Sequence, residues 1–479
     1  MPLRISTASN YQRVLSGLRL NLSKLVLSQQ QVATGRRILR PSDDPSGTAR
    51  VLSFNRQISG TDRFIGAIGL GRSVVDTGAV ALESGSGVLS DARQRLIQGM
   101  NGTLSSSDRE ALANEIELLR AEMLGIANTR SGERNLFGGT KSGESPWVDR
   151  MIGGVSRAVY TGNDDEQRVR IGEGVEIAIT VSGQDAFAKN NGTGPTFSGL
   201  TGIGTGSTGD EGQGYEYLTL RHDGTSSATL ASSGIALVGG GAQDSLLGDN
   251  TLTIDAAAGT IQLGNGQSID IPQAGTADFT NFTVSNEFGG ELHLDFSGYG
   301  GGNFTGTVSG TGSIAIDGTT FTPIDFNETD LELIHPDSGN TLHFDMTSAK
   351  RAGVELVTFG GNVNIFDTLQ GMVDDLRNAD GLSQTELTDR LGIWLNEADR
   401  GHDNLLVSLG SLGSRSERMT KTEDKLEGVQ LQLRSLRSEE EDVDISEAAL
   451  ELARAQQSLE LAQASGARLL QTNLLNFLR

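Results

Sequence analysis

The sequence predicts a multidomain α+β protein, with long antiparallel helices formed by both ends of the chain and a β-rich, glycine-rich insert between them. Near each end, apolar residues recur in alternating steps of three and four, as in helices that lie along other helices. In the middle of the chain, alternation with a period of two replaces that pattern. Each end carries too little apolar surface to fold alone, so we expect the two ends to pair.

The last stretch, residues 443–479, carries a heptad pattern along its length. Asp442 and Asp444 supply an N-cap and favourable charge at its start. Toward its end the apolar row steps sideways to Leu474 and Phe477, because periods of 3.6 and 3.5 residues drift apart. The predicted seam of this helix contains Ile445, Ala448, Leu452, Ala455, Leu459, Ala462, Gly466 and Leu469.

The first stretch of the chain keeps the same steps, and Gly35 follows it as a C-cap residue should. An alternative reading is two unrelated amphipathic helices on one globular core, since any helix that faces a core carries a similar stripe. The predicted seam of this helix contains Ala8, Tyr11, Leu15, Leu18, Leu22, Leu25, Gln29 and Val32.

Composition excludes several classes of function. Without cysteine, the chain can form neither a disulfide nor a thiolate metal site. The net charge of −23 argues against nucleic acid or an anionic membrane as partner, and we expect neither. No apolar run looks long enough to span a bilayer, and residues 1–6 lack the features of a secretory signal. If the protein leaves the cell, we expect a route that reads no cleaved signal peptide.

A long helix is predicted after the first one. The prolines around Ser42–Asp44 predict a rigid connection that ends in an N-cap, with Pro45 at the first helical position. The heptad phase then lasts for about 70–80 Å of helix. Asn101–Gly102 is a turn signal, and a helix from Ser105–Asp108 to Asn128 should run back antiparallel. The seam of the long helix contains Phe54, Ile58, Thr61, Ile65, Ile68, Arg72, Val75, Ala79, Leu82, Ser86, Leu89, Arg93, Leu96 and Met100.

From about residue 151 the pattern changes to short strands separated by Gly and Asp turns. Leu292–Asp295 recurs as Leu342–Asp345, which indicates a duplicated β unit. Residues 190–214 are so rich in glycine that we expect a mobile loop. Helix returns from Phe366 onward. The predicted domains are 1–42 with 443–479, 43–150 with 361–442, 151–189, and 190–360.

Nothing in the sequence indicates catalysis. Gly204–Gly209 matches the dinucleotide-binding pattern by letter, but acidic residues and no helix follow it. His293 and His343 each precede an aspartate by two residues; such pairs could bind metal, although repeated strands also repeat side chains. The other histidines fit no triad with a serine nucleophile. We therefore expect no catalytic residue, no cofactor, no metal site and no enzymatic activity.

One set of motifs is shared with a known family. It comprises Arg4–Thr7, Ser28–Gly35, Pro41–Pro45, Asn101–Ser105, Asn128–Gly139, Tyr160–Asn163, Ile171–Gly174, Val181–Gly183, Asp185–Phe187, Asn364–Leu369 and Leu412–Arg415. On these residues the chain resembles the bacterial flagellin superfamily and, within it, the hook–filament junction proteins. The resemblance covers roughly 1–190 and 360–479, and Pro41–Pro45 is its specific element. The insert between departs from the junction pattern and is similar to the variable outer domains of flagellins.

The resemblance implies a structural protein of the extracellular flagellum, exported unfolded and joining the hook to the flagellin filament. In such subunits the terminal helices order only when subunits assemble. It also implies as partners other copies of the chain, a hook-side junction protein, flagellin, and an export chaperone on the C-terminal helix. For the assembly interface we predict Tyr11, Leu15, Leu18, Leu22, Leu25, Leu452, Leu459, Leu469, Leu474 and Phe477.

Two other functions stay open on the sequence alone. A filament flagellin with a surface domain would share the fold and differ in its position and copy number. A secreted adhesive or carbohydrate-binding protein would instead work through the β insert.

Overall fold

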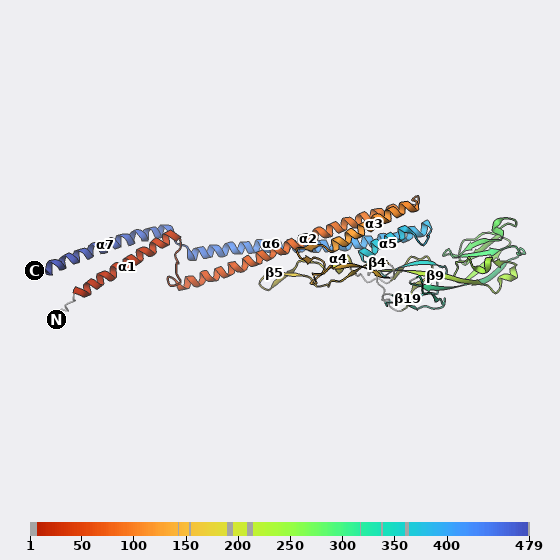
Figure 1. Cartoon of the computed structure of the whole chain (residues 1–479), viewed down its shortest axis with the longest axis horizontal. Helices are drawn as coiled ribbons and strands as arrows, with labels where there is room; N and C mark the ends of the chain where they lie inside the picture. The colour runs from red at the N-terminus through yellow and green to blue at the C-terminus, as the bar shows by residue number, and fades with distance from the viewer. Residues whose placement is uncertain are drawn as a thin grey trace. The chain divides into compact units, whose positions relative to one another are not determined.

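The computed structural model describes residues 7–141, 143–152, 155–188, 195–207, 214–316, 318–336, 339–359 and 364–477 (Figure 1). The chain divides into two compact units. The first contains Met1–Gly71, Val169–Ile177 and Glu417–Arg479, and the second contains Arg72–Arg168 and Ala178–Ser416. The division into four domains stays a prediction.

Helices occupy both ends of the chain, as predicted. They are α1 (Thr7–Thr34), α2 (Pro45–Gly99), α3 (Ser106–Ala127), the short α4 (Gly183–Phe187), α5 (Ile365–Arg377), α6 (Gln384–Glu441) and α7 (Ile445–Phe477). The seam predicted for α2 is confirmed, since its residues at the heptad positions include the buried Ile58, Ile68, Val75, Leu82, Leu89 and Leu96.

Two polar members of that seam have partners on α6. Ser86 Oγ lies 3.4 Å from Nδ1 of His402, and Arg93 Nε lies 2.8 Å from Asp399 Oδ1. Because a polar pair is satisfied in only one alignment of two helices, these contacts fix the antiparallel register of α2 and α6.

Helix α3 begins where its capping residues predict. The Ser105 hydroxyl accepts a hydrogen bond from the Asp108 amide, and the Asp108 carboxylate accepts one from the Ser105 amide, which makes a capping box. Arg95 of α2 pairs with Glu115 of α3 at 2.7 Å. Together with the approach of Gly85 to Met123, this pair confirms that α3 runs antiparallel to α2.

The strands form short hairpins and one larger layered region. The hairpin strands are β1 (Arg130–Ser131), β2 (Arg134–Asn135), β3 (Trp147–Ile152), β4 (Val155–Tyr160), β5 (Arg168–Gly172) and β6 (Val175–Ala178). Strands of the insert are β7 (Pro195–Phe197), β8 (Gly204–Thr205), β9 (Tyr215–Ser226), β10 (Ala236–Leu237), β11 (Gly248–Asp255), β12 (Thr260–Leu263), β13 (Ile269–Asp270), β14 (Phe282–Ser285), β15 (Glu291–Asp295), β16 (Phe304–Ala315), β17 (Thr322–Pro323), β18 (Leu331–Ile334), β19 (Thr341–Asp345) and β20 (Gly353–Phe359). Since β7 and β8 lie within 190–214, the expectation of one mobile loop there was wrong for these strands; 189–194 and 208–213 lie outside the described residues.

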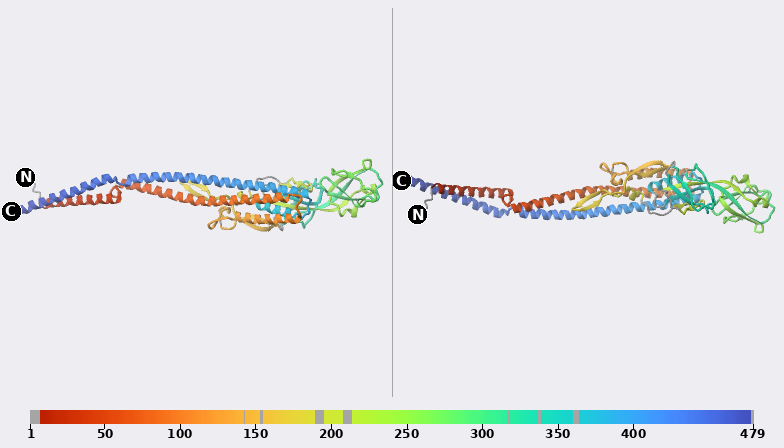
Figure 2. Two further views of the ribbon diagram at one scale, coloured as in Figure 1. Left: turned by 90° about the horizontal axis from the view of Figure 1, so that it is seen from above. Right: turned by 90° about the horizontal axis from the view of Figure 1, so that it is seen from below.

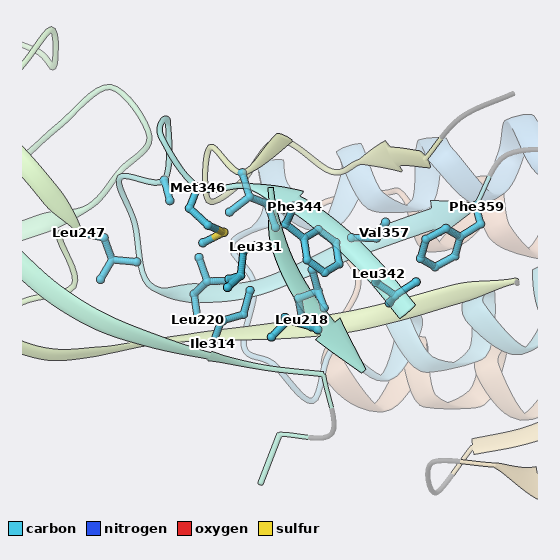
Figure 3. Packing of buried hydrophobic residues seen from close by; sticks show 13 residues of the cluster. Leu218, Leu220, Leu247, Ile314, Leu331, Leu342, Phe344, Met346, Val357 and Phe359 are labelled. Carbon is cyan, nitrogen blue, oxygen red and sulfur yellow. The ribbon is translucent and has the colours of Figure 1, made fainter. Parts of the chain in front are cut away.

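Among the described residues the insert has one eight-stranded sheet, ordered β13-β12-β11-β16-β9-β20-β7, with β17 paired to β16. Two three-stranded sheets, β10-β15-β14 and β18-β19-β8, accompany it. Two apolar clusters form the core of the insert. One contains Leu218, Leu220, Leu342, Phe344 and Val357, whose side chains lie together in Figure 3. The other contains Leu252, Ile254, Leu292, Leu294 and Phe296.

The two clusters confirm the duplicated β unit. The repeated sequence forms β15 in one half and β19 in the other, and each is the central strand of a three-stranded sheet. The aspartates that end these strands also act alike. Oδ1 of Asp295 accepts a hydrogen bond from the Ser297 amide at 2.8 Å, and Oδ1 of Asp345 accepts one from the Thr347 amide at 2.9 Å.

Over one 18-residue window, α2 is long and apolar enough to cross a membrane by length and composition, which differs from the expectation. Of that window, 33% is buried inside the protein. A core helix of a soluble protein meets the same criteria, because both need a long apolar stripe.

Matched substitutions test the duplication. Leu292→Ala and Leu342→Ala occupy equivalent, fully buried positions, so each should lower the free energy of unfolding of the insert by about 2–5 kcal/mol. Ile334→Ala, at an exposed position, should change it by less than about 0.5 kcal/mol. Urea denaturation of the three variants gives these values. A large loss at one leucine and almost none at the other would contradict equivalent packing.

Candidate assembly surface of the terminal helices

The terminal helices α1 and α7 lie side by side and run antiparallel, within one compact unit (Figure 2). The Asn21 side-chain amide donates to the Ser458 carbonyl at 3.4 Å. At Gly466 the side chain of Val14 packs directly against the α7 backbone, because an added Cβ would lie 3.3 Å from Val14 Cγ1. The predicted pairing of the two ends is confirmed, and glycine at 466 is what permits this close packing.

The predicted seam on α7 is mostly confirmed. Ala448 and Gly466 are buried, and Leu452 and Leu459 are half-buried against α1. Ile445 was predicted wrongly as a seam residue, since 66% of it is exposed. It is the first residue of the helix and precedes Ala448, the first buried residue of the seam. The side chains of Leu469, Leu474 and Phe477 lie outside the described residues.

The predicted seam on α1 needs a correction. Leu15, Leu18 and Leu25 are half-buried as expected, but Leu22 is 52% exposed and Gln29 is exposed. The row facing α7 instead contains two polar residues, Asn21 and Ser28, and Ser28 is buried. Their small side chains fit beside the Leu and Ala seam of α7, whereas the sequence pattern favours the adjacent leucine. The side chain of Tyr11 lies outside the described residues.

The register leaves apolar side chains of α1 uncovered on both flanks of the side away from α7. These side chains are 39–58% exposed: Leu20, Leu22, Val26 and Leu27. We call these four residues the outer face. On α7, Leu450 and Leu461 are similarly exposed. Exposed apolar side chains that recur along a helix in this way are a candidate contact with another molecule. The sequence carried a signal for three members of this face, because Leu20, Val26 and Leu27 are apolar residues of α1 off the predicted seam.

Other candidate sites from the sequence have structural roles. Gly204 and Thr205 form strand β8 rather than the turn before a helix, and part of that glycine motif lies outside the described residues. His293 Nδ1 lies 3.2 Å from Asp244 Oδ1, and His343 Nδ1 lies 3.5 Å from Asp330 Oδ1. In the part of the chain that the structure describes, no group of three or more ligating side chains could hold a metal ion.

A polar network in the second unit surrounds a cavity of about 600 Å³, at the start of β9 and beside α5. Tyr215 donates to Asp374 at 2.9 Å, and Tyr217 donates to Asp375 at 3.1 Å. Asp375 also accepts from Arg390 at 3.1 Å and from the Trp394 indole at 2.6 Å. Burial raises the pKa of both aspartates. Since these groups satisfy one another, the network anchors β9 to the helices.

Beside this network, Asp367 of α5 is buried and, within the described residues, its Oδ1 has no hydrogen-bond partner. Burial raises the pKa of Asp367 to about 6, although Arg157 and Arg120 oppose the shift. An ionised carboxylate at this place therefore costs stability at neutral pH.

Replacing this carboxylate should make stability less dependent on pH. Folding raises the pKa of Asp367 from 3.8 to about 6, so the neutral carboxyl is favoured in the folded protein. Its contribution to the stability of the folded wild type is fully present below pH 3.8 and is lost as the pH rises through 6. Asp367→Asn should therefore stabilise the protein by up to about 3 kcal/mol above pH 7 and by little at pH 4. Denaturation from pH 4 to 8 measures this. A difference that is constant with pH would contradict a buried titrating Asp367.

Two nearby leucines of α7 test the pairing of the terminal helices. Leu459→Asp places a charge in the seam and should weaken the α1–α7 contact by about 1–3 kcal/mol. Leu461→Asp is the matched control, because Leu461 is 64% exposed on the same helix. Hydrogen exchange of the amides in α1 and α7 reads out the pairing. Equal loss of protection in both variants would refute the observed seam.

Comparison with known proteins finds matches at both ends of the chain. Residues 5–142 match the bacterial flagellin N-terminal helical region, and residues 398–478 match the bacterial flagellin C-terminal helical region. Flagellar hook-associated protein 3 of Escherichia coli (strain K12) is 25% identical over 186 residues, which is 39% of this chain and 57% of that protein. A flagellin of Listeria monocytogenes is 32% identical over 112 residues, 23% of this chain and 39% of that protein.

The chain thus spans a little over half the length of the E. coli relative. A crystal structure of Xanthomonas campestris FlgL aligns with 80% of this chain and 99% of that one, at 18% identity and a TM-score of 0.43. The flagellin regions at both ends enclose the strand-rich region that the structure describes. Both terminal regions of this chain thus match the helical regions of bacterial flagellin, and part of the chain is similar to flagellar hook-associated protein 3.

Proposed function

We propose that this chain is a structural subunit of the bacterial flagellum that joins the hook to the flagellin filament, and that it is not an enzyme. The observation that carries the proposal is the outer face of α1, on a helix pair whose sequence matches flagellin. The relative named for the hook, E. coli hook-associated protein 3, supports the junction role.

The outer face is the surface on which we expect a second copy to pack. Copies that use one face to meet a different face form an open, non-closing assembly, as a tubular polymer requires. Contacts made only in the assembly then offset the entropy lost when the terminal helices order. The full predicted interface, including Tyr11, Leu469, Leu474 and Phe477, belongs to this proposal.

We further propose the partners and location that follow from this role. One end of the assembled ring would meet a hook-side junction protein and the other would meet flagellin, outside the cell. Export would need no cleaved signal peptide, and a chaperone would cover the C-terminal helix before export. In this scheme residues 1–42 with 443–479 form the assembly core and 190–360 form the surface insert.

A filament flagellin is the second candidate. The match to the Listeria flagellin supports it, and so does a large insert of the kind expected on a filament surface. The two functions predict the same fold, so position on the flagellum distinguishes them.

Immunogold labelling with antibody to the β insert gives that position. A single band between hook and filament on isolated flagella is the expected result. Label along the whole shaft would make the protein a filament flagellin. No label on the appendage would refute both functions and favour a secreted adhesive protein.

Charges on the outer face should block assembly without unfolding the subunit. Leu22→Asp with Val26→Asp alters side chains that α7 leaves exposed, so thermal stability of the monomer should change little. Incorporation into flagella should fall at least about tenfold, because a buried unpaired charge costs well over 1.4 kcal/mol per contact. Ser59→Asp, at an exposed position of α2 outside the outer face, is the control. Normal incorporation of the double variant would show that the outer face is not an interface.

A further inference from the structure

Helices α1 and α2 are interrupted at the same place as helices α6 and α7. Helix α1 ends at Thr34 and α2 begins at Pro45, while α6 ends at Glu441 and α7 begins at Ile445 (Figure 1). The two interruptions contact each other, and all of these residues belong to one compact unit. We call Gly35–Arg37, Asp44 and Glu440–Val443 the clasp.

The backbone part of the clasp is one antiparallel bridge between Arg36 and Asp442. The Arg37 amide donates to the Glu441 carbonyl at 2.7 Å, and the Val443 amide donates to the Gly35 carbonyl at 2.9 Å. Gly35 has a φ of +70°, so the chain turns sharply out of α1 into this bridge. The start of α7 is therefore tied directly to the end of α1.

The side-chain part of the clasp centres on Arg37. Its guanidinium donates to the Glu440 carbonyl at 2.8 Å and to Asp44 Oδ2 at 3.1 Å. Arg50 of α2 pairs with the same Glu440 at 2.5 Å, and Arg36 pairs with Glu441 at 3.0 Å. Arg37 thus joins the end of α6 to the start of α2.

Asp44 and Glu440 of the clasp stay charged over the physiological range. The Gly47 amide, the Ser46 hydroxyl and the Arg37 guanidinium lower the pKa of Asp44 to about 2. The Arg50 guanidinium lowers the pKa of Glu440. Within the acidic run Glu439–Asp442, Glu440 and Glu441 thus bind arginines.

Exposed pairs of this kind are weak, because water and salt screen them. The Arg36, Arg37 and Arg50 side chains are 43–60% exposed. A backbone segment with few hydrogen bonds and little apolar burial opens more easily than the helices on either side of it. The clasp therefore has the features of a hinge, whereas α1 and α7 remain packed along their seam.

We propose that the clasp is a hinge about which α1 and α7 pivot together, as one body, relative to the adjoining turns of α2 and α6, and that Arg37 is the latch that limits the swing. The inference does not depend on the proposed function, because it rests on contacts within one subunit.

Spin-label distances measure this motion in the full chain. Since the chain has no cysteine, introduced cysteines are the only labelled positions. Ser23→Cys with Gln457→Cys reports the distance between α1 and α7, and Ser59→Cys with Gln457→Cys reports that between α2 and α7; all three positions are exposed. We expect a narrow distance distribution for the first pair and a broader one for the second.

In an Arg37→Ala background the second distribution should broaden about twofold while the first stays narrow, and 1 M NaCl should act in the same direction. Arg40→Ala is the matched control, an exposed arginine of the same connection that should change neither distribution. The hinge would be overturned if the α2–α7 distance distribution were as narrow as the α1–α7 distribution and unchanged by Arg37→Ala. Broadening of both distributions together would show that α1 and α7 move separately.

Discussion

The packing of α1 against α7 is the contact on which the rest of the structure depends. The α7 side of the seam consists of Leu, Ala and Gly, so side chains of α1 pack closely against it, as at Gly466. A seam of small residues buries little apolar area, and it leaves apolar side chains such as Leu22 and Leu461 uncovered. The same contact therefore forms the paired ends and presents the surface that a second copy can cover. The chain between Gly35 and Val443 therefore leaves from the end of α1 and returns to the start of α7.

Periodicity predicted the helices well because it is repeated many times. Over α2 a one-residue error in phase would expose most of its buried residues, so the seam could be read directly from the sequence. On the shorter α1 the same method chose Leu22 and Gln29 where the structure uses Asn21 and Ser28. The heptad pattern, extended from the neighbouring leucines, selected these two residues. Close helix packing instead selects small side chains, even when they are polar.

Contacts between distant segments could not be predicted in this way. No sequence pattern links Tyr215 with Asp374. Only in the folded chain does the Tyr215 hydroxyl lie 2.9 Å from Asp374 Oδ2. The clasp shows the same limit: Arg37 and Glu440 lie near opposite ends of the sequence, and an acidic run looks like a solvated surface until its arginine partners are known. The duplicated β unit could be predicted because the repeated sequence forms equivalent strands. Asp295 and Asp345 end these strands with the same hydrogen bond.

The central claim is that the two ends of one chain pair through the clasp, and an engineered disulfide tests it most directly. Arg36 and Asp442 face each other as a non-hydrogen-bonded antiparallel pair, for which the Cα atoms lie about 4.5 Å apart, within the range of a disulfide. Oxidation of the cysteine-free chain carrying Arg36→Cys and Asp442→Cys should give a nearly complete intramolecular cross-link, seen as faster migration on a non-reducing gel. Free thiols, or cross-links only between chains, would contradict the paired ends.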